Sequence, residues 1–250
     1  MRALTWMRKR PKTLASTAGV LIGTVALTGM AVAYDGLPTT KVDLNDAGVW
    51  LTKASSLLVG HFNSASTVID GGLRTSGEDF DILQDEQNVL VVDGGNDTVT
   101  AVDPATVTLA DSAPIPGDAK VSLGGTTTAI LDRASGFLWV TPVNELSGFD
   151  LKAADPLAKL GKKADATVGR DGTVHAVSAE RSEVLTVRID AQGEISTAES
   201  RLEEFGKGAE PTITAVGETP VVLDATSGVV QTPGGFRTEI ADAESAVLQY

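Results

Sequence analysis

A motif of about 40 residues recurs along the chain and constrains its fold more than any other feature. Each copy has an apolar run, a polar residue, a short polar turn and a second apolar run. Clear copies span 89–104, 128–143, 174–189 and 220–235, and 49–64 holds an earlier one. Spacings of 40, 39, 46 and 46 residues separate the polar residues that close the first run, which are Lys53, Asp93, Asp132, Ser178 and Asp224. Repeats of roughly 40–50 residues are typical of propeller blades.

Local patterning within the copies favours strands over helices. Val, Thr and Ile alternate with polar residues, and pairs such as Gly94-Gly95 and Asp171-Gly172 mark tight turns. One blade cannot bury both faces of its sheet, but neighbouring blades bury each other's faces. The sequence therefore predicts an all-β, propeller-like domain over residues 35–250. A β-sandwich, or tandem sandwiches with evenly spaced hairpins, is the alternative.

The number of copies raises the question of ring closure. Five copies make at most a small ring, and many propellers have more blades. The final residues, 245–250, have the composition of a strand rather than of a polar tail. We therefore expect an incomplete ring in the front part of a longer protein.

The first 34 residues have the pattern of a membrane segment. Residues 1–12 contain five basic residues and no acidic one, and residues 13–34 contain no charge at all. A helix needs roughly 20 apolar residues to cross the hydrocarbon core, and basic residues stay on the cytoplasmic side. The pattern predicts a basic cytoplasmic region followed by a transmembrane signal anchor, with residues 35–250 outside the cell membrane.

A cleaved signal peptide is the alternative to the anchor. Ala31-Val32-Ala33 has the small-x-small pattern of a signal-peptidase site, with cleavage before Tyr34. Cleavage would release residues 35–250 as a secreted protein. The uncharged segment is longer than the usual apolar region of a cleaved signal, which favours the anchor.

Charge and cysteine content narrow the partners of the exported region. The chain has 20 basic and 33 acidic residues, and the first 34 residues hold five of the basic ones, which leaves 15 against 33, a net charge of −18. Such a region repels nucleic acid. The chain has no cysteine, so neither disulfides nor a lipid-modified cysteine are available. The expected partners are the membrane, through residues 13–34, and a protein or cell-wall component.

Three segments resemble a known family. They are VWL at 49–51, DILQD at 81–85 and VVDGGNDTVTAVDPAT at 91–106. With the membrane segment, they resemble the N-terminal region of large actinobacterial envelope proteins, in which a membrane segment and a propeller-like region precede tandem fibronectin type III or Ig-like domains. The resemblance implies a surface or adhesion-type scaffold and no catalytic residue set. The chain departs from the family in having no fibronectin-type region.

Motifs for catalysis or metal binding are absent from the sequence. There is no H-E-x-x-H, G-x-S-x-G or G-x-x-x-x-G-K-[ST] pattern. His61 and His175 are interpreted as surface or strand-end histidines. The segment from Asp43 to Gly48 loosely resembles a calcium loop, but Ala54 stands where an EF-hand needs glutamate, so only a shallow calcium site between blades remains open. Trp50 and Trp139 are too few for a quinone-dependent dehydrogenase.

From these observations we expect no catalytic, cofactor-binding or metal-binding residues, and a chain that is not an enzyme. The predicted function is a membrane-tethered, non-catalytic, extracytoplasmic binding or scaffold module of the cell envelope. The alternative is an enzyme or ligand sensor with its site on the propeller axis. Polar and charged side chains from several repeats would converge on one pocket in the alternative, whereas small or apolar groups would line the axis of a spacer.

Overall fold

The computed structural model describes residues 48–241 and 246–248. The chain divides into two compact units, residues 1–44 and 45–250, and all described residues belong to the second. The predicted cytoplasmic region and membrane segment, residues 1–12 and 13–34, lie outside the described residues. Within the described part, the helices are too short or too polar to cross a membrane.

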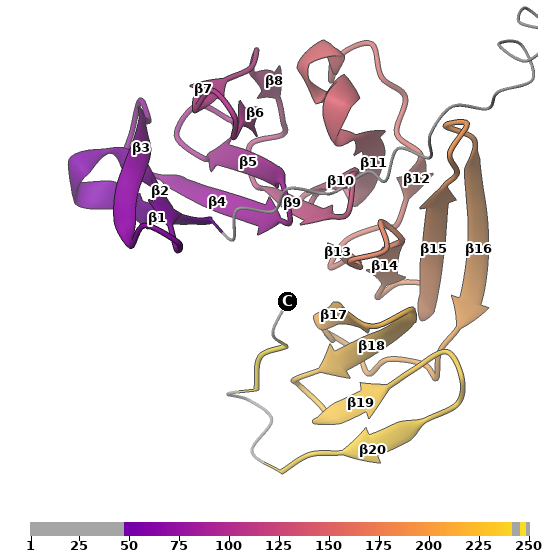
Figure 1. Ribbon diagram of the computed structural model, residues 1–250. Coiled ribbons are helices and arrows are strands. Elements are labelled where there is room, and N and C mark those ends of the chain that lie inside the picture. Colours follow the sequence, from indigo (N-terminus) through magenta and orange to yellow (C-terminus); the bar gives the residue numbers. More distant parts are fainter. Residues whose placement is uncertain (1–47, 242–245, 249–250) are drawn as a thin grey trace, which may run out of the picture. The chain divides into compact units, whose positions relative to one another are not determined.

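Five antiparallel sheets follow one another along the chain (Figure 1). The first has three strands, β1 (Val49–Lys53), β2 (Leu58–Asn63) and β3 (Val68–Arg74). The second contains β4 (Phe80–Asp85), β5 (Asn88–Asp93), β6 (Thr98–Asp103) and β7 (Thr108–Leu109), with β8 (Ala113–Pro114) also paired to β6. A short 3-10 helix, η1 (Ala54–Ser56), joins β1 to β2.

The other three sheets have four strands each. The third contains β9 (Ala119–Gly124), β10 (Thr127–Asp132), β11 (Phe137–Pro142) and β12 (Ala158–Lys159), with the 3-10 helix η2 (Val143–Gly148) after β11. The fourth contains β13 (Asp165–Val168), β14 (Val174–Ser178), β15 (Glu183–Ile189) and β16 (Ile195–Arg201). The fifth contains β17 (Pro211–Val216), β18 (Thr219–Asp224), β19 (Val229–Gln231) and β20 (Arg237–Glu239).

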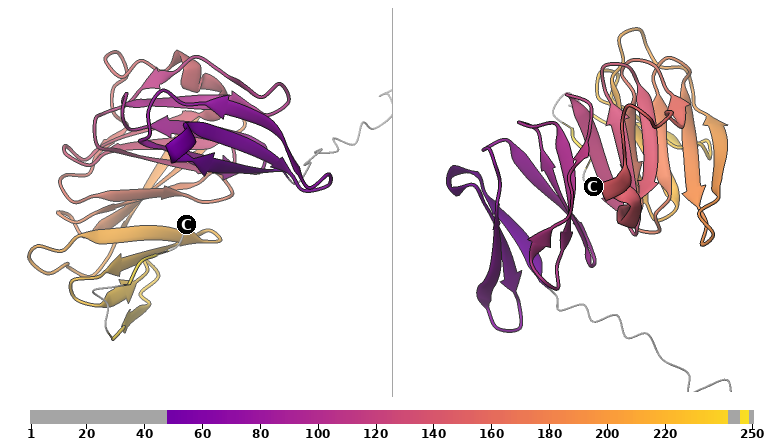
Figure 2. Two further views of the ribbon diagram at one scale, coloured as in Figure 1. Left: turned by 90° about the vertical axis from the view of Figure 1, so that its left-hand side faces the viewer. Right: turned by 90° about the horizontal axis from the view of Figure 1, so that it is seen from above.

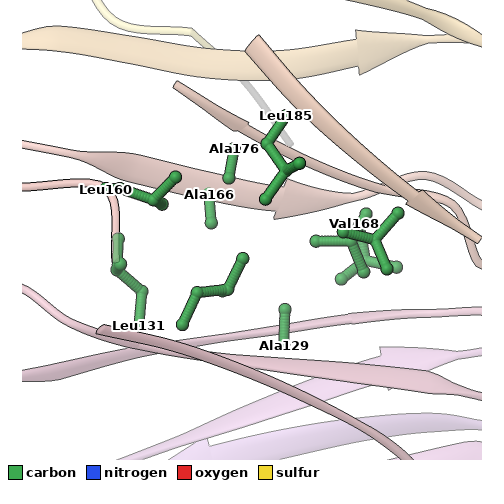
Figure 3. Packing of buried hydrophobic residues seen from close by; sticks show 10 residues of the cluster. Ala129, Leu131, Leu160, Ala166, Val168, Ala176 and Leu185 are labelled. Carbon is green, nitrogen blue, oxygen red and sulfur yellow. The ribbon is translucent and has the colours of Figure 1, made fainter. Parts of the chain in front are cut away.

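Consecutive sheets pack face to face, as Figure 2 shows. Each pair of neighbours shares an apolar cluster, and the one between the third and fourth sheets includes Leu131, Leu160, Ala166 and Leu185 (Figure 3). Because side chains alternate between the two faces of a strand, a sheet covered on both faces buries every residue, as β14 does. The prediction of an all-β, propeller-like fold is confirmed. Five successive sheets are not the arrangement that the alternative, a β-sandwich, predicts.

Four of the five aligned positions occupy the same place in their sheets. Asp93, Asp132, Ser178 and Asp224 each end the second strand. Their side chains accept hydrogen bonds from the following turn. For example, the Asp132 carboxylate accepts from the Ala134 backbone N at 2.9 Å, and that of Asp224 accepts from the Thr226 N at 3.0 Å. A polar residue at this point stabilises the tight connection to the third strand.

The alignment of the fifth position, Lys53, was wrong, because it chose the end of the first strand instead of the second. Lys53 ends β1, the first strand of its sheet, whereas Asn63 ends the second strand. Asn63 also has the expected chemistry, because its Oδ1 accepts from the backbone N of Ala65 at 3.0 Å and of Ser66 at 3.1 Å. The alignment failed because two apolar runs separated by a short polar segment describe the first hairpin of a blade as well as the second.

Candidate functional site

The first strands of consecutive sheets lie next to one another. β4 contacts β9, β9 contacts β13, and β13 contacts β17. A cavity of about 470 Å³ lies across these four strands, and we call it the first-strand pocket. Its lining comprises Asp81, Leu83, Gln84, Asp85, Lys120, Val121, Ser122, Leu123, Gly124, Thr167, Val168, Gly169, Arg170, Thr214 and Ala215. Four consecutive sheets therefore contribute to one pocket.

Small residues occupy one end of the first-strand pocket. Gly124, Gly169 and Ala215 lie there, near the ends of β9, β13 and β17. A Cβ on Gly124 would lie 2.2 Å from the Gly169 carbonyl oxygen, and one on Gly169 would lie 3.6 Å from the Ala215 Cβ. Close approach of the strands therefore requires glycine at position 124. We call this end of the pocket the small-residue end.

Two charged side chains accompany the small-residue end. Asp85 ends β4, and one of its oxygens accepts a hydrogen bond of 2.5 Å from the Gly125 backbone N. Arg170 follows β13, in the turn to β14, and its side chain is exposed. Among the described residues, the Arg170 guanidinium makes neither an ion pair nor a side-chain hydrogen bond. This end thus presents the Asp85 carboxylate from the second sheet and the Arg170 guanidinium, which has no ion-pair partner among the described residues, from the fourth.

A buried ion pair lies toward the opposite end. Lys120 Nζ lies 2.8 Å from Asp165 Oδ1, and the two side chains are only 12% and 10% exposed. The second oxygen of Asp165 accepts from the Ile213 backbone N at 3.0 Å. Lys120 belongs to the third sheet, Asp165 to the fourth and Ile213 to the fifth, so one carboxylate connects three sheets. Asp81, exposed on β4, adds a further carboxylate to the pocket wall.

A larger hollow of about 620 Å³ lies beside η2, but it is open and built differently. Its lining comes from one stretch of chain between Thr141 and Ala154, and its charged residues, Glu145 and Asp150, are both acidic. The first-strand pocket instead combines charges of both signs from separate sheets. Such convergence of a few polar groups in a concave, partly apolar site is typical of ligand-binding sites.

The two histidines were interpreted as surface or strand-end residues, and the surface interpretation was wrong because both lie in the interior. His61 is 6% exposed and His175 is 1% exposed. His61 Nδ1 lies 2.6 Å from Asp70 Oδ1, and the His61 ring centroid lies 5.0 Å from that of Trp50. Burial lowers the pKa of His175, which favours its neutral form. Neither histidine lines the first-strand pocket.

Residues 78–86 include five acidic residues, of which Asp81 and Asp85 line the pocket. The described residues contain no group of three or more His, Asp or Glu side chains placed to hold a metal ion. The calcium-like segment, except for Gly48, lies outside the described residues. Sequence reasoning missed Lys120 and Arg170. The one signal that could have indicated Arg170 was its position beside the predicted Asp171-Gly172 turn, at the expected end of a strand.

Comparisons with known proteins identify the fold. No family model and no curated protein match the chain. Among solved structures, dihydro-heme d1 dehydrogenase NirN in complex with DHE is 8% identical, with a TM-score of 0.52, over 82% of this chain and 45% of that one. The complex of KlAtg21 with the coiled coil of AgAtg16 gives 13% identity and a TM-score of 0.50, over 70% and 58%. Virginiamycin B lyase from Staphylococcus aureus is 14% identical, with a TM-score of 0.44, over 78% of this chain and 67% of that one.

The likeness to the dehydrogenase NirN overturns the expectation that the chain is not an enzyme. That expectation rested on a propeller-like fold without familiar catalytic motifs, yet the dehydrogenase NirN shares the fold. The identity of 8% means that only the fold is shared. The chain spans 45% of the length of NirN and 58% of the KlAtg21 complex chain. The function of this chain therefore depends on the residues of its own pocket.

Proposed function

We propose that this protein is an extracytoplasmic binding module of the cell envelope, and that its ligand site is the first-strand pocket. One observation carries the proposal, namely that charged side chains from three consecutive sheets line a single cavity. Asp81 and Asp85 come from the second sheet, Lys120 from the third and Arg170 from the fourth. A spacer needs contacts between its sheets but gains nothing from an uncommitted guanidinium beside an opening.

The interior of the pocket supports the same proposal. Leu83, Leu123 and Ala215 contribute apolar surface to the same pocket as the charged groups. Binding sites for small molecules usually combine such apolar lining with a few polar groups that orient the ligand. The volume of about 470 Å³ lies within the range of roughly 300–1,000 Å³ that is usual for these sites.

Blocking the pocket tests this function. The probes are L-alanyl-L-leucine, N-acetylglucosamine, citrate and spermidine, each added to the full chain. We expect at least one probe to raise the melting temperature of the unmodified protein, because a ligand that binds only the folded state stabilises it. The Ala215→Trp variant, which fills the small-residue end, should lose this rise.

Two arginine variants control this experiment. Arg170→Gln should weaken the response, whereas Arg133→Gln, at an exposed turn away from the pocket, should keep it in full. If Ala215→Trp does not fold, the contrast between the two arginine variants decides the question. A panel without effect, or an effect that all variants retain, would overturn the proposed function.

We also propose that residues 13–34 hold the module at the outer face of the cell membrane. The proposal rests on the uncharged segment of 22 residues and on the five basic residues before it. External protease added to intact cells should remove the region after residue 35 while the membrane stays sealed. Protection of this region in intact cells, with cleavage only after lysis, would contradict the orientation.

A further inference from the structure

The charged residues of the first-strand pocket divide into those that form an ion pair within the protein and those that do not. Lys120 is buried against Asp165, so its charge is already balanced within the protein. The other charged groups make no ion pair among the described residues, and they are the Asp81 and Asp85 carboxylates on one wall and the Arg170 guanidinium on another. A ligand that satisfies both walls must carry a negative group for the arginine and a positive group for an aspartate.

The turn that carries Arg170 has a fixed backbone, and its guanidinium can receive a planar anion. The turn that carries Arg170 is fixed by backbone hydrogen bonds from Gly169 N to Thr173 O at 2.8 Å and from Gly172 N to Gly169 O at 2.9 Å. The neighbouring carboxylate of Asp171 accepts hydrogen bonds from Thr173 N at 3.1 Å and Thr173 Oγ1 at 2.7 Å. A guanidinium on a fixed turn binds a carboxylate through two parallel hydrogen bonds.

The opposite wall is built to receive a cation. Asp81 and Asp85 lie four residues apart on β4, so they share one face of the strand at a separation of about 13 Å. The hydrogen bond from the Gly125 backbone N fixes the Asp85 side chain through Oδ2. The Oδ1 atom of Asp85 is the acceptor on this wall that we assign to an ammonium group. Charge-assisted bonds of this kind are the stronger ones in proteins.

We infer that the first-strand pocket takes a short peptide with free ends, with its carboxylate on Arg170 and its ammonium group on Asp85. This inference rests on the proposed function and specifies its ligand class. The apolar side chains of Leu83, on the same face of β4 as Asp85, and of Leu123, on β9, also line the pocket and fit small or aliphatic residues of such a peptide. A volume of about 470 Å³ leaves room for two or three residues rather than for a long chain.

Calorimetric titration of the full chain tests the ligand class. The probes are L-alanyl-L-leucine, its N-acetyl form and its C-terminal amide. We expect each cap to weaken binding to the unmodified protein at least tenfold, because each removes one charge-assisted contact. The amide should cause no further loss in Arg170→Gln, and the acetyl cap should cause none in Asp85→Asn, whose amide oxygen still accepts from Gly125 N.

The outcomes separate this inference from the proposed function. Two results would overturn the peptide assignment, namely equal binding of capped and free dipeptides, or binding of citrate or N-acetylglucosamine alone. If Ala215→Trp abolishes the binding in either case, the pocket function stands. If no probe binds in a manner sensitive to Ala215→Trp or Arg170→Gln, both are overturned. Losses from each cap that vanish in the matching variant support the inference.

Discussion

Replacing Gly136 by alanine is expected to lower the free energy of unfolding by about 2–5 kcal/mol. Gly136 lies in the turn between β10 and β11 with φ +74°, and a Cβ there would lie 1.9 Å from the Gly161 carbonyl oxygen. A left-handed backbone costs an L-residue roughly 1–2 kcal/mol, and overpacking against fixed backbone adds about 1–3 kcal/mol. Urea unfolding of the two proteins measures the difference.

Gly193→Ala is the matched control for this prediction. Gly193 also has a left-handed backbone, with φ +81°, but its added Cβ would meet no atom within 4 Å. Only the conformational cost of about 1–2 kcal/mol should remain. Equal losses in the two variants would show that the close approach of the chain segments at Gly136 and Gly161 is not a constraint on the fold.

Removal of the Asp165 carboxylate should have a similarly large effect. We expect Asp165→Ala to lower the free energy of unfolding by about 3–5 kcal/mol, because it removes the carboxylate that lies 2.8 Å from the buried Lys120 ammonium. It also removes the acceptor of the Ile213 backbone N. Asp165→Asn should cost less, since its amide oxygen can still accept from Ile213. Urea unfolding monitored by circular dichroism checks both values.

Two comparisons make the Asp165 prediction specific. Glu203→Ala removes an exposed ion pair with Arg237, 2.9 Å long, and should change stability by no more than about 1 kcal/mol. The double variant Lys120→Met, Asp165→Leu removes both buried charges and should recover part of the loss. An Asp165→Ala protein as stable as Glu203→Ala would contradict the role of Asp165 in joining three sheets.

The fold class could be predicted because its signal is local. Alternation of apolar and polar residues and the turn residues after each second strand are visible within about ten residues, and they located Asp93, Asp132, Ser178 and Asp224 correctly. The first copy was harder, because the same pattern fits either hairpin of a blade. Lys53 was therefore assigned to a position that belongs to Asn63.

The pocket depends on how separate sheets align, which no local pattern encodes. Asp85 and Gly125 lie 40 residues apart in sequence, and Lys120 and Asp165 lie 45 apart, yet each pair is in contact. Several acidic residues lie near Asp85 in the sequence, but no local pattern indicates the basic residues across from it. His175 was misassigned for a related reason, since a sheet covered on both faces buries polar positions of the alternation as well. His61 lies instead on the face of β2 that also buries Val59.

The most direct test of the first-strand pocket locates a bound ligand. The measurement is the set of backbone amide chemical shifts of the full chain, with and without the probe that raises the melting temperature most. We predict that the largest shifts belong to Gly169, Arg170 and Ala215, which line the pocket, and to Gly125, whose backbone N donates to Asp85. Unchanged signals from these residues, with shifts concentrated in the 144–154 segment beside η2, would contradict the assignment.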